Sequence, residues 1–138
     1  MKNKIRKEIK EKIKSIQNKD QESIEMSQIL FNNADFVSTN DIFAFVSLQD
    51  EISTLQIINQ IIKLNKNLYL PRVKEDSMDF YLIDKNKDLF EQLEKNQWDI
   101  YEPKTNLKKV NFNTDKNLKK ILILVPGLAF TKTGKRLG

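Results

Sequence analysis

The sequence of 138 residues contains no cysteine and no histidine. Without cysteine the chain can form no disulfide bond and can offer no thiolate as a nucleophile. Without histidine it lacks the side chain that proteins use most often as a general base and as a metal ligand. Any acid–base chemistry must therefore fall to carboxylates, lysines or tyrosines, or the reaction must be driven by positioning and electrostatics.

Long apolar runs are missing as well, because no stretch approaches the roughly 20 residues that span a bilayer. The N-terminal segment MKNKIRKEIKEK is basic, but neither the apolar region nor the small-residue cleavage site of a signal peptide follows it. We therefore expect a soluble cytoplasmic protein that does not bind membranes.

Positive charge is in excess, and lysine supplies nearly all of it. The formal net charge is +5, and the basic residues are 21 lysines scattered along the chain and 3 arginines. This pattern favours a solvated lysine-rich surface, although it also suits an anionic small ligand or RNA. The arginines, Arg6, Arg72 and Arg136, stand out because the planar guanidinium group binds phosphate or carboxylate through paired hydrogen bonds.

Glycine is scarce, and its three occurrences, Gly127, Gly134 and Gly138, all lie in the closing stretch PGLAFTKTGKRLG. This stretch directly follows the apolar run ILILV at 121–125. A glycine-spaced basic loop after a strand can direct backbone N–H groups at phosphate oxygens, and Arg136 would add its guanidinium group. The alternative is an ordinary turn with Gly134 at a positive φ angle.

Four other candidate ligand contacts each have a purely structural alternative. Lys2 and Arg6 lie four residues apart on one face of a predicted helix, where they could hold a phosphate or face solvent. Glu51 could accept hydrogen bonds from the ring of a ligand, or it could stabilise the first turn of a helix. Trp98 is the only tryptophan, and its ring could stack on a heterocycle or anchor the core.

Apolar residues at helical spacing predict helices in four places. The first covers 2–17 with a stripe of isoleucines (5, 9, 13 and 16), and the second covers about 21–33 with an Asp20 cap and with Ile24, Ile29, Leu30 and Phe31 buried. The third runs from a cap at Asp50 or Ser53 to about Asn65 with Leu55, Ile58, Ile61, Ile62 and Leu64 facing inward, and 88–96 forms one or two turns capped by Asp88.

Short apolar runs predict strands at 42–48, 68–73, 78–83 and 121–125, and the last is the most clearly buried of them. Pro71 indicates that its strand ends there or lies at an edge. The alternation of strands and helices predicts an α/β layered domain with a largely parallel sheet flanked by helices. Ligands of such sheets bind beyond the carboxyl ends of the strands, which directs attention to 47–51, 71–72 and the stretch from Pro126 onward.

Six motifs, in order and at sensible spacing, resemble the 5-formyltetrahydrofolate cyclo-ligase family, also called methenyltetrahydrofolate synthetases. The most specific is PGLAF followed by G-x-RLG at 126–138. The others are the N-terminal K-x-x-x-R pair (Lys2 and Arg6), SLQDEIST (47–54), LPRV (70–73), Met78 and WDIYEP (98–103). The resemblance covers essentially the whole chain and implies a cyclo-ligase fold of the CoA-transferase-like kind over residues 1–138.

The resemblance implies that ATP and Mg²⁺ serve as cofactors in converting 5-formyltetrahydrofolate to 5,10-methenyltetrahydrofolate. ATP would phosphorylate the formyl oxygen, N10 of the folate would attack, and phosphate would leave. Such a reaction suits a chain without cysteine or histidine, because phosphoryl transfer depends mostly on positioning and on neutralisation of charge. The nucleophile belongs to the substrate, so no catalytic side chain is assigned.

The resemblance also assigns binding residues. It implies ATP contacts at Lys2, Arg6, Gly134, Arg136 and Gly138, and folate contacts at Val46, Glu51, Met78 and Trp98. Arg72 matches a PR motif whose role is structural or close to a phosphate.

Two departures from the family pattern concern the nucleotide loop. In the family RLG opens a longer loop, RLG-x-G-x-GYYD, and the sequence stops three residues into it, so we expect an incomplete C-terminal part and no metal ligand within this chain. Thr131 stands where the family usually has aspartate, which leaves the role of that position in ordering the loop or a metal open.

Two alternatives remain beside an active cyclo-ligase. One is an inactive homologue that still binds folate, and the other is a basic RNA-binding module, which the lack of an aromatic-rich RNA-binding motif disfavours. We expect a monomer whose partners are folate and ATP rather than nucleic acid.

Overall fold

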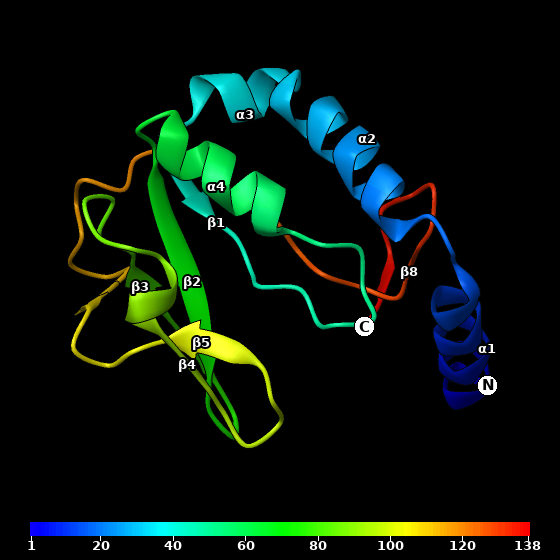
Figure 1. The fold of residues 1–138 in the computed structure, drawn as a ribbon. Helices are drawn as coiled ribbons and strands as arrows, with labels where there is room; N and C mark the ends of the chain where they lie inside the picture. The colour runs from blue at the N-terminus through cyan, green and yellow to red at the C-terminus, as the bar shows by residue number, and fades with distance from the viewer.

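The computed structural model describes all residues 1–138 as helices arranged around a mixed β-sheet (Figure 1). The helices are α1 (Lys2–Ser15), α2 (Lys19–Phe31), α3 (Ala34–Ser38), α4 (Leu55–Lys63) and one 3-10 turn, η1 (Phe90–Gln92). The strands are β1 (Asp41–Phe43), β2 (Asn67–Val73), β3 (Met78–Leu82), β4 (Leu93–Lys95), β5 (Tyr101–Pro103), β6 (Lys108–Lys109), β7 (Ile121–Ile123), β8 (Ala129–Phe130) and β9 (Arg136–Leu137). None of the helices combines the length and the apolar character that a membrane crossing requires.

The main sheet has five strands in the order β6-β3-β2-β1-β7. Strand β1 runs parallel to both β2 and β7, whereas β3 is antiparallel to β2 and to β6. This parallel centre, flanked by helices, confirms the predicted α/β fold, and the antiparallel edge makes the sheet mixed. Two separate hairpins, β4–β5 and β8–β9, complete the strands.

Helix α4 packs on one face of the sheet, and α2 lies alongside α4 (Figure 1). Alternate residues of β2, Leu68 and Leu70, belong to this core because successive side chains of a strand point to opposite faces. Leu64, predicted to face inward, is instead 47% exposed just beyond the end of α4. The residues that α4 buries are Ile57, Ile58 and Ile61, of which Ile58 and Ile61 confirm the prediction.

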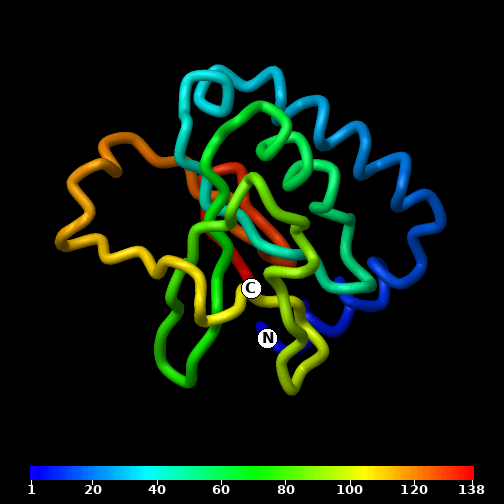
Figure 2. The backbone as a smooth tube through the Cα atoms, turned by 60° about the vertical axis from the view of Figure 1, so that its left-hand side comes forward, coloured from blue at the N-terminus to red at the C-terminus, as the bar shows by residue number.

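The opposite face of the sheet is covered by a loop rather than by a helix. Phe43 of β1 and Tyr69 of β2 stack there with their ring centroids 4.4 Å apart. Phe112 lies 5.5 Å from the Phe43 ring, and Val110 is buried in the same cluster. Both come from the long segment between β6 and β7, which forms a wide loop at one side of the molecule (Figure 2). Burial and the hydrogen bond from Tyr69 to Asp41 raise the pKa of the Tyr69 hydroxyl.

Helix α1 forms as predicted, but its isoleucine stripe is not buried. No residue of α1 is buried, and Ile5 is 37% exposed. In Figure 1 this helix stands apart from the sheet, beyond the N-terminal end of α2. Periodicity therefore identified the helix, but it did not indicate how little of the apolar face is covered.

Helix α2 turns only part of its predicted face inward, because Leu30 and Phe31 pack against the core as predicted but the two isoleucines do not. Ile24 and Ile29 are exposed, and Ser23 and Ser27 are buried in their place. The Ser23 hydroxyl donates to the carbonyl of Ser53 at 2.7 Å, and the Ser27 hydroxyl donates to the carbonyl of Ser23 at 2.7 Å. Two small, internally satisfied hydroxyls let the helix backbone approach the α4 region closely, which hydrophobic periodicity cannot reveal.

Predicted caps are only partly correct. Helix α2 begins at Lys19 after Asn18, so Asp20 lies in its first turn instead of capping it. Helix α4 begins at Leu55, whose N–H donates to the Ser53 hydroxyl at 3.2 Å. Of the predicted turns at 88–96 only η1 forms, with the Asp88 carboxylate accepting from the N–H of Glu91 at 3.2 Å.

Strand ends also differ from the predictions. The predicted strand 42–48 ends at Phe43, after which the chain leaves the sheet. Strand β2 continues through Pro71 because β1 no longer pairs there, so no partner needs the missing N–H. Strand β7, predicted to be the most clearly buried, pairs on one edge only, and Ile123 is 48% exposed.

Lys66 is buried between α3 and β2. Its ammonium group donates to the carbonyls of Val37 at 3.1 Å and Thr39 at 2.8 Å, and it lies 5.4 Å from the centre of the Phe36 ring. Cations stabilise helix C-termini because the last carbonyls carry partial negative charge. This lysine therefore fixes the C-terminal end of α3 to the sheet.

Candidate functional site

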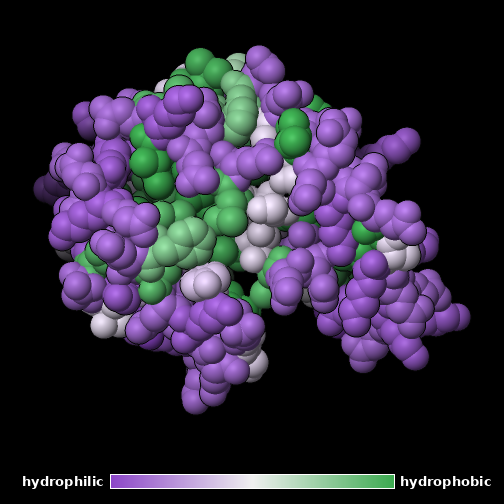
Figure 3. Space-filling view, in the orientation of Figure 1, coloured by the Kyte–Doolittle hydropathy of each residue, from purple (hydrophilic) through white to green (hydrophobic).

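A cleft of about 350 Å³ lies beyond the carboxyl ends of the parallel strands. Four segments far apart in the sequence contribute to it: 45–51 after β1, 71–78 at the β2–β3 turn, 96–102 of the β4–β5 hairpin, and 126–138 after β7. Ligands of open α/β sheets bind at this edge, where the chain leaves neighbouring strands. In the space-filling view, hydrophobic side chains gather across the middle of the same face between hydrophilic flanks (Figure 3).

Large apolar side chains in the cleft wall are unusually exposed. Met78 is 50% exposed and Trp98 is 61% exposed, and Leu48 and Val73 are similarly accessible. A contiguous accessible apolar surface inside a concave site indicates a ligand with an apolar or aromatic body. The exposure of Trp98 contradicts the alternative that this residue anchors the core.

Thr54 holds the segment after β1 rigidly. Its hydroxyl donates to the carbonyl of Phe45 at 2.8 Å and accepts from the N–H of Ser47 at 3.0 Å. The Thr54 N–H in turn donates to the Ser47 hydroxyl at 3.0 Å. These bonds fix the backbone that presents Val46 to the cleft.

Glu51 lies in a turn at the cleft, not in a helix. Its Oε1 accepts from the N–H of Leu48 at 3.1 Å, and α4 starts only at Leu55, so the first-turn alternative for Glu51 is wrong. The carboxylate also lines the cleft. Only Oε1 bonds within the chain, so Oε2 is available to accept a hydrogen bond from a ligand.

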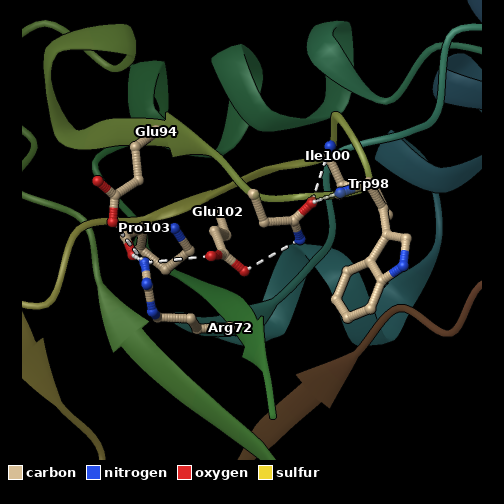
Figure 4. A network of polar contacts seen from close by, with 7 residues as sticks. Arg72, Glu94, Trp98, Ile100, Glu102 and Pro103 are labelled. Atoms are coloured by element: carbon tan, nitrogen blue, oxygen red, sulfur yellow. Dashed lines mark hydrogen bonds and ion pairs between the residues drawn. The ribbon is translucent and has the colours of Figure 1, made fainter. Parts of the chain in front are cut away.

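Arg72 ties the β4–β5 hairpin to the central sheet (Figure 4). Its Nη1 contacts Glu94 Oε1 at 2.7 Å and Glu102 Oε1 at 3.3 Å, and it donates to the carbonyl of Pro103 at 2.9 Å. These contacts favour the structural role over the phosphate-proximal one. Trp98 and Ile100 lie at the other end of the same network (Figure 4).

The closing stretch forms a short hairpin. Gly134 adopts φ +89°, a left-handed conformation that favours glycine, between β8 and β9. The Thr131 hydroxyl accepts from the N–H of Lys135 at 2.9 Å, and its N–H donates to the carbonyl of Lys135 at 2.9 Å. Thr131 therefore orders this turn itself.

Two arginines converge on Gly138. Arg6 Nε donates to the carbonyl of Gly138 at 3.1 Å, which joins α1 to the hairpin across 132 positions of sequence. Arg136 Nε donates to the carbonyl of Pro126, and a side chain at position 138 would lie 2.5 Å from Arg136 Nη2. A side chain at 138 would therefore displace the Arg136 guanidinium from its present place. The two arginines give this end of the cleft a positive charge.

The predicted site residues divide into two groups. Lys2 is exposed on α1 with no contact to the hairpin, Gly134 lies in the turn outside the cleft lining, and Arg6 reaches the cleft only through Gly138. The other predicted residues all line the cleft, and they are Val46, Glu51, Met78, Trp98, Arg136 and Gly138.

Sequence reasoning missed Asn96 and Glu102, which also line the cleft. Asn96 Oδ1 accepts from the N–H groups of Trp98 and Ile100, a side-chain-to-backbone turn for which asparagine is favoured. The pattern Asn-x-Trp-Asp at 96–99 was the available signal, because asparagine and aspartate are favoured in turns. In the structure Asp99 ends that turn with φ +61°.

Residues 1–138 do not fit a metal site held by the protein alone. No group of three or more aspartate, glutamate, histidine or cysteine side chains is close enough to share an ion. Mg²⁺ is commonly bound through one or two carboxylates together with the phosphates of a nucleotide, so it need not bring a protein cage of its own.

The fold and the cleft together define an α/β protein with an apolar-walled cleft at the carboxyl ends of its parallel strands and arginine side chains at one end of that cleft. The chain belongs to the 5-formyltetrahydrofolate cyclo-ligase family, whose sequence profile matches residues 1–138. It is similar to the 5-formyltetrahydrofolate cyclo-ligase of Mus musculus, with 28% identity over 138 positions that cover 97% of this chain and 66% of the mouse protein.

The fold is similar to that of a solved structure, the 5,10-methenyltetrahydrofolate synthetase of Aquifex aeolicus. The TM-score is 0.80 and the identity 22%, and the match covers 99% of this chain and 66% of that one. The chain therefore spans just under two thirds of the length of both relatives.

Proposed function

We propose that this protein converts 5-formyltetrahydrofolate to 5,10-methenyltetrahydrofolate in an ATP-dependent reaction. The γ-phosphoryl group of ATP moves to the formyl oxygen and ADP is released; N10 then attacks the formyl carbon and loses its proton, and phosphate leaves. Membership of the cyclo-ligase family supports this reaction class.

One observation carries the proposal. Side chains from four distant segments converge on one cleft with an accessible tryptophan and methionine, two carboxylates in its wall, and Arg136 at one end, where Gly138 joins Arg6 to the cleft. A flat pterin ring suits the apolar wall, and phosphate groups suit the arginines, because guanidinium binds phosphate through paired hydrogen bonds.

Residue roles follow from this arrangement. We infer that Val46, Met78 and Trp98 contact the folate ring and that Glu51 accepts hydrogen bonds from its N–H groups. Arg136 and Gly138, joined to Arg6, meet the nucleotide phosphates. Lys2 and Gly134 act at a greater distance, Lys2 through its charge on α1 and Gly134 through the shape of the hairpin turn.

No protein ligands for Mg²⁺ are assigned within residues 1–138. We infer that the ion enters with ATP, where it neutralises phosphate charge. Thr131 contributes by ordering the β8–β9 turn, which keeps Arg136 at the cleft.

The test is a turnover assay. Purified protein is mixed with 5-formyltetrahydrofolate and magnesium ATP, and methenyltetrahydrofolate is followed by its near-ultraviolet absorbance, with a reaction lacking ATP as the control. ATP-dependent product is expected. Arg136→Lys keeps the positive charge but loses the guanidinium fork, so it should reduce turnover.

Other results would support other functions. A folded protein that binds folate without turnover would be a folate-binding homologue. Binding to RNA that weakens steeply with salt, together with indifference to folate, would instead identify a nucleic-acid-binding module. We further propose that the protein acts as a cytoplasmic monomer, which sedimentation and cell fractionation test.

A further inference from the structure

We propose that Asn96 is a positioning residue that holds Trp98 at the cleft wall, and that Glu102 and Arg72 fix Asn96 in turn. This inference rests on the proposed function, because it concerns how the ring of a folate meets the indole. It assigns to the loop of the β4–β5 hairpin a second purpose beyond connecting two strands.

Trp98 needs such support because packing does not hold it. The residue is 61% exposed, and it lines both the main cleft and a neighbouring polar groove of about 470 Å³. The groove is lined by charged residues such as Lys74 and Glu75, so the indole has open space on two sides. Its place must therefore be set by the backbone that carries it.

The side chain of Asn96 organises that backbone. Its Oδ1 accepts from the N–H of Trp98 at 2.9 Å and from the N–H of Ile100 at 3.1 Å. The backbone of Asn96 closes the same loop, donating to the carbonyl of Ile100 at 3.0 Å and accepting from the N–H of Asp99 at 3.0 Å. With Asp99 in the left-handed region, the loop has one well-defined shape that includes the Trp98 peptide.

Glu102 fixes the orientation of the Asn96 amide. Asn96 Nδ2 donates to Glu102 Oε2 at 3.3 Å, and Glu102 is only 6% exposed. A flipped amide would turn its NH₂ group toward two N–H donors and its oxygen toward a carboxylate, so only one orientation is satisfied. The other oxygen of Glu102 lies 3.3 Å from Arg72 Nη1.

The contacts thus form a continuous chain from the central sheet to the cleft (Figure 4). Arg72 belongs to β2, Glu102 to β5, and Asn96 starts the loop that presents Trp98. The β4–β5 ladder pairs residues 93–95 with 101–103 without any help from the Asn96 side chain. Removing that side chain should therefore displace Trp98 while leaving the hairpin and the fold intact.

The experiment uses Trp98 as its own probe, since it is the only tryptophan. Asn96→Ala is compared with Asn111→Ala, a matched control whose Oδ1 accepts from the N–H of Asn113 at 3.0 Å in a loop outside the cleft. For Asn96→Ala we expect lower tryptophan anisotropy and stronger quenching by acrylamide. We also expect the dissociation constant and KM for 5-formyltetrahydrofolate to rise about 10-fold, the scale of one stacking contact, with kcat within about 2-fold. Asn111→Ala should match the wild type.

A conservative variant adds a rescue test. Asn96→Asp keeps an acceptor for both N–H groups but sets a carboxylate against Glu102. It should restore part of the Trp98 anisotropy at neutral pH and more of it in mild acid, where one of the two carboxyls binds a proton. Anisotropy equal to that of Asn96→Ala at every pH would refute the positioning role.

The two proposals fail in different ways. Unchanged anisotropy and quenching in Asn96→Ala would overturn the positioning of Trp98 whether or not folate binds. Changed anisotropy with unchanged folate affinity would overturn the link between that position and the ligand. A wild-type protein that binds no 5-formyltetrahydrofolate would overturn the proposed function, while the ligand-free anisotropy would still decide what Asn96 does.

Discussion

Glu51→Gln tests the folate end of the cleft most directly. Glutamine keeps the shape of glutamate and an oxygen that can accept from the N–H of Leu48, now 3.1 Å from Oε1, so the turn should survive. What disappears is the negative charge facing the ligand. A hydrogen bond to a charged group contributes roughly 1.5–3 kcal/mol, so the affinity for 5-formyltetrahydrofolate should fall about 10- to 150-fold.

The affinity for ATP should change little, because the arginines that we assign to its phosphates meet at Gly138, which belongs to a different part of the chain from Glu51. Titration calorimetry with each ligand separately measures both affinities, and Glu91→Gln, an exposed glutamate of η1, is the matched control. An ATP affinity that changes by less than about 2-fold is expected. Equal loss of both ligands, or no loss of folate affinity, would refute the assignment of Glu51.

Three further predictions concern other parts of the molecule. Arg6→Ala removes the bond to Gly138, so the KM for ATP should rise more than the KM for folate in steady-state assays; the reverse order would contradict the assignment. Lys66→Met leaves two carbonyls at the end of α3 without their donor and should lower the free energy of unfolding by about 1–3 kcal/mol in urea titrations, whereas the exposed Lys63→Met should change it by less than about 0.5 kcal/mol. The Lys74 ammonium, whose Nζ lies 2.7 Å from Asp79 Oδ2, lowers the pKa of Asp79 from its ordinary value, so this ion pair stabilises the fold above that ordinary value and loses its effect as the pH falls through the lowered pKa. Asp79→Asn should flatten the acid limb of unfolding curves, and an unchanged limb would exclude this pair as its source.

Sequence patterns predicted the parts of the fold that depend on local periodicity. The isoleucines of α4 recur at helical spacing, and the short apolar run of β2 is typical of a strand, so each element carries its own signal. The burial of Ser23 in α2 could not be predicted, because the carbonyl that satisfies its hydroxyl belongs to Ser53 in a distant turn. Burial of β7 was overestimated because an apolar run does not show whether its strand lies in the centre or at the edge of the sheet.

The candidate site shows the same division. Gly134 was predicted from local turn chemistry as one of two alternatives, and its positive φ agrees with that turn. Family resemblance selected residues such as Glu51 and Trp98, which the fold brings into one cleft, and their roles remain predictions. Asn96 escaped notice because its importance comes from two backbone groups and one buried carboxylate that only the folded hairpin assembles.

The parallel pairing of β1 with β7 also determines when the cleft can form during folding. The ladder joins Asp41–Phe43 to Ile121–Ile123, so about 80 residues must be looped before the segment from Pro126 reaches its place. Contacts between such distant positions form slowly, because the chain loses the entropy of loop closure before the strand pairing contributes any stability. The β2–β3 hairpin and α4 can form early from local contacts, whereas the cleft is completed only at the end. Ligand binding would thus report the last step of folding, and a variant that weakens β7 should lose binding while most of its secondary structure persists.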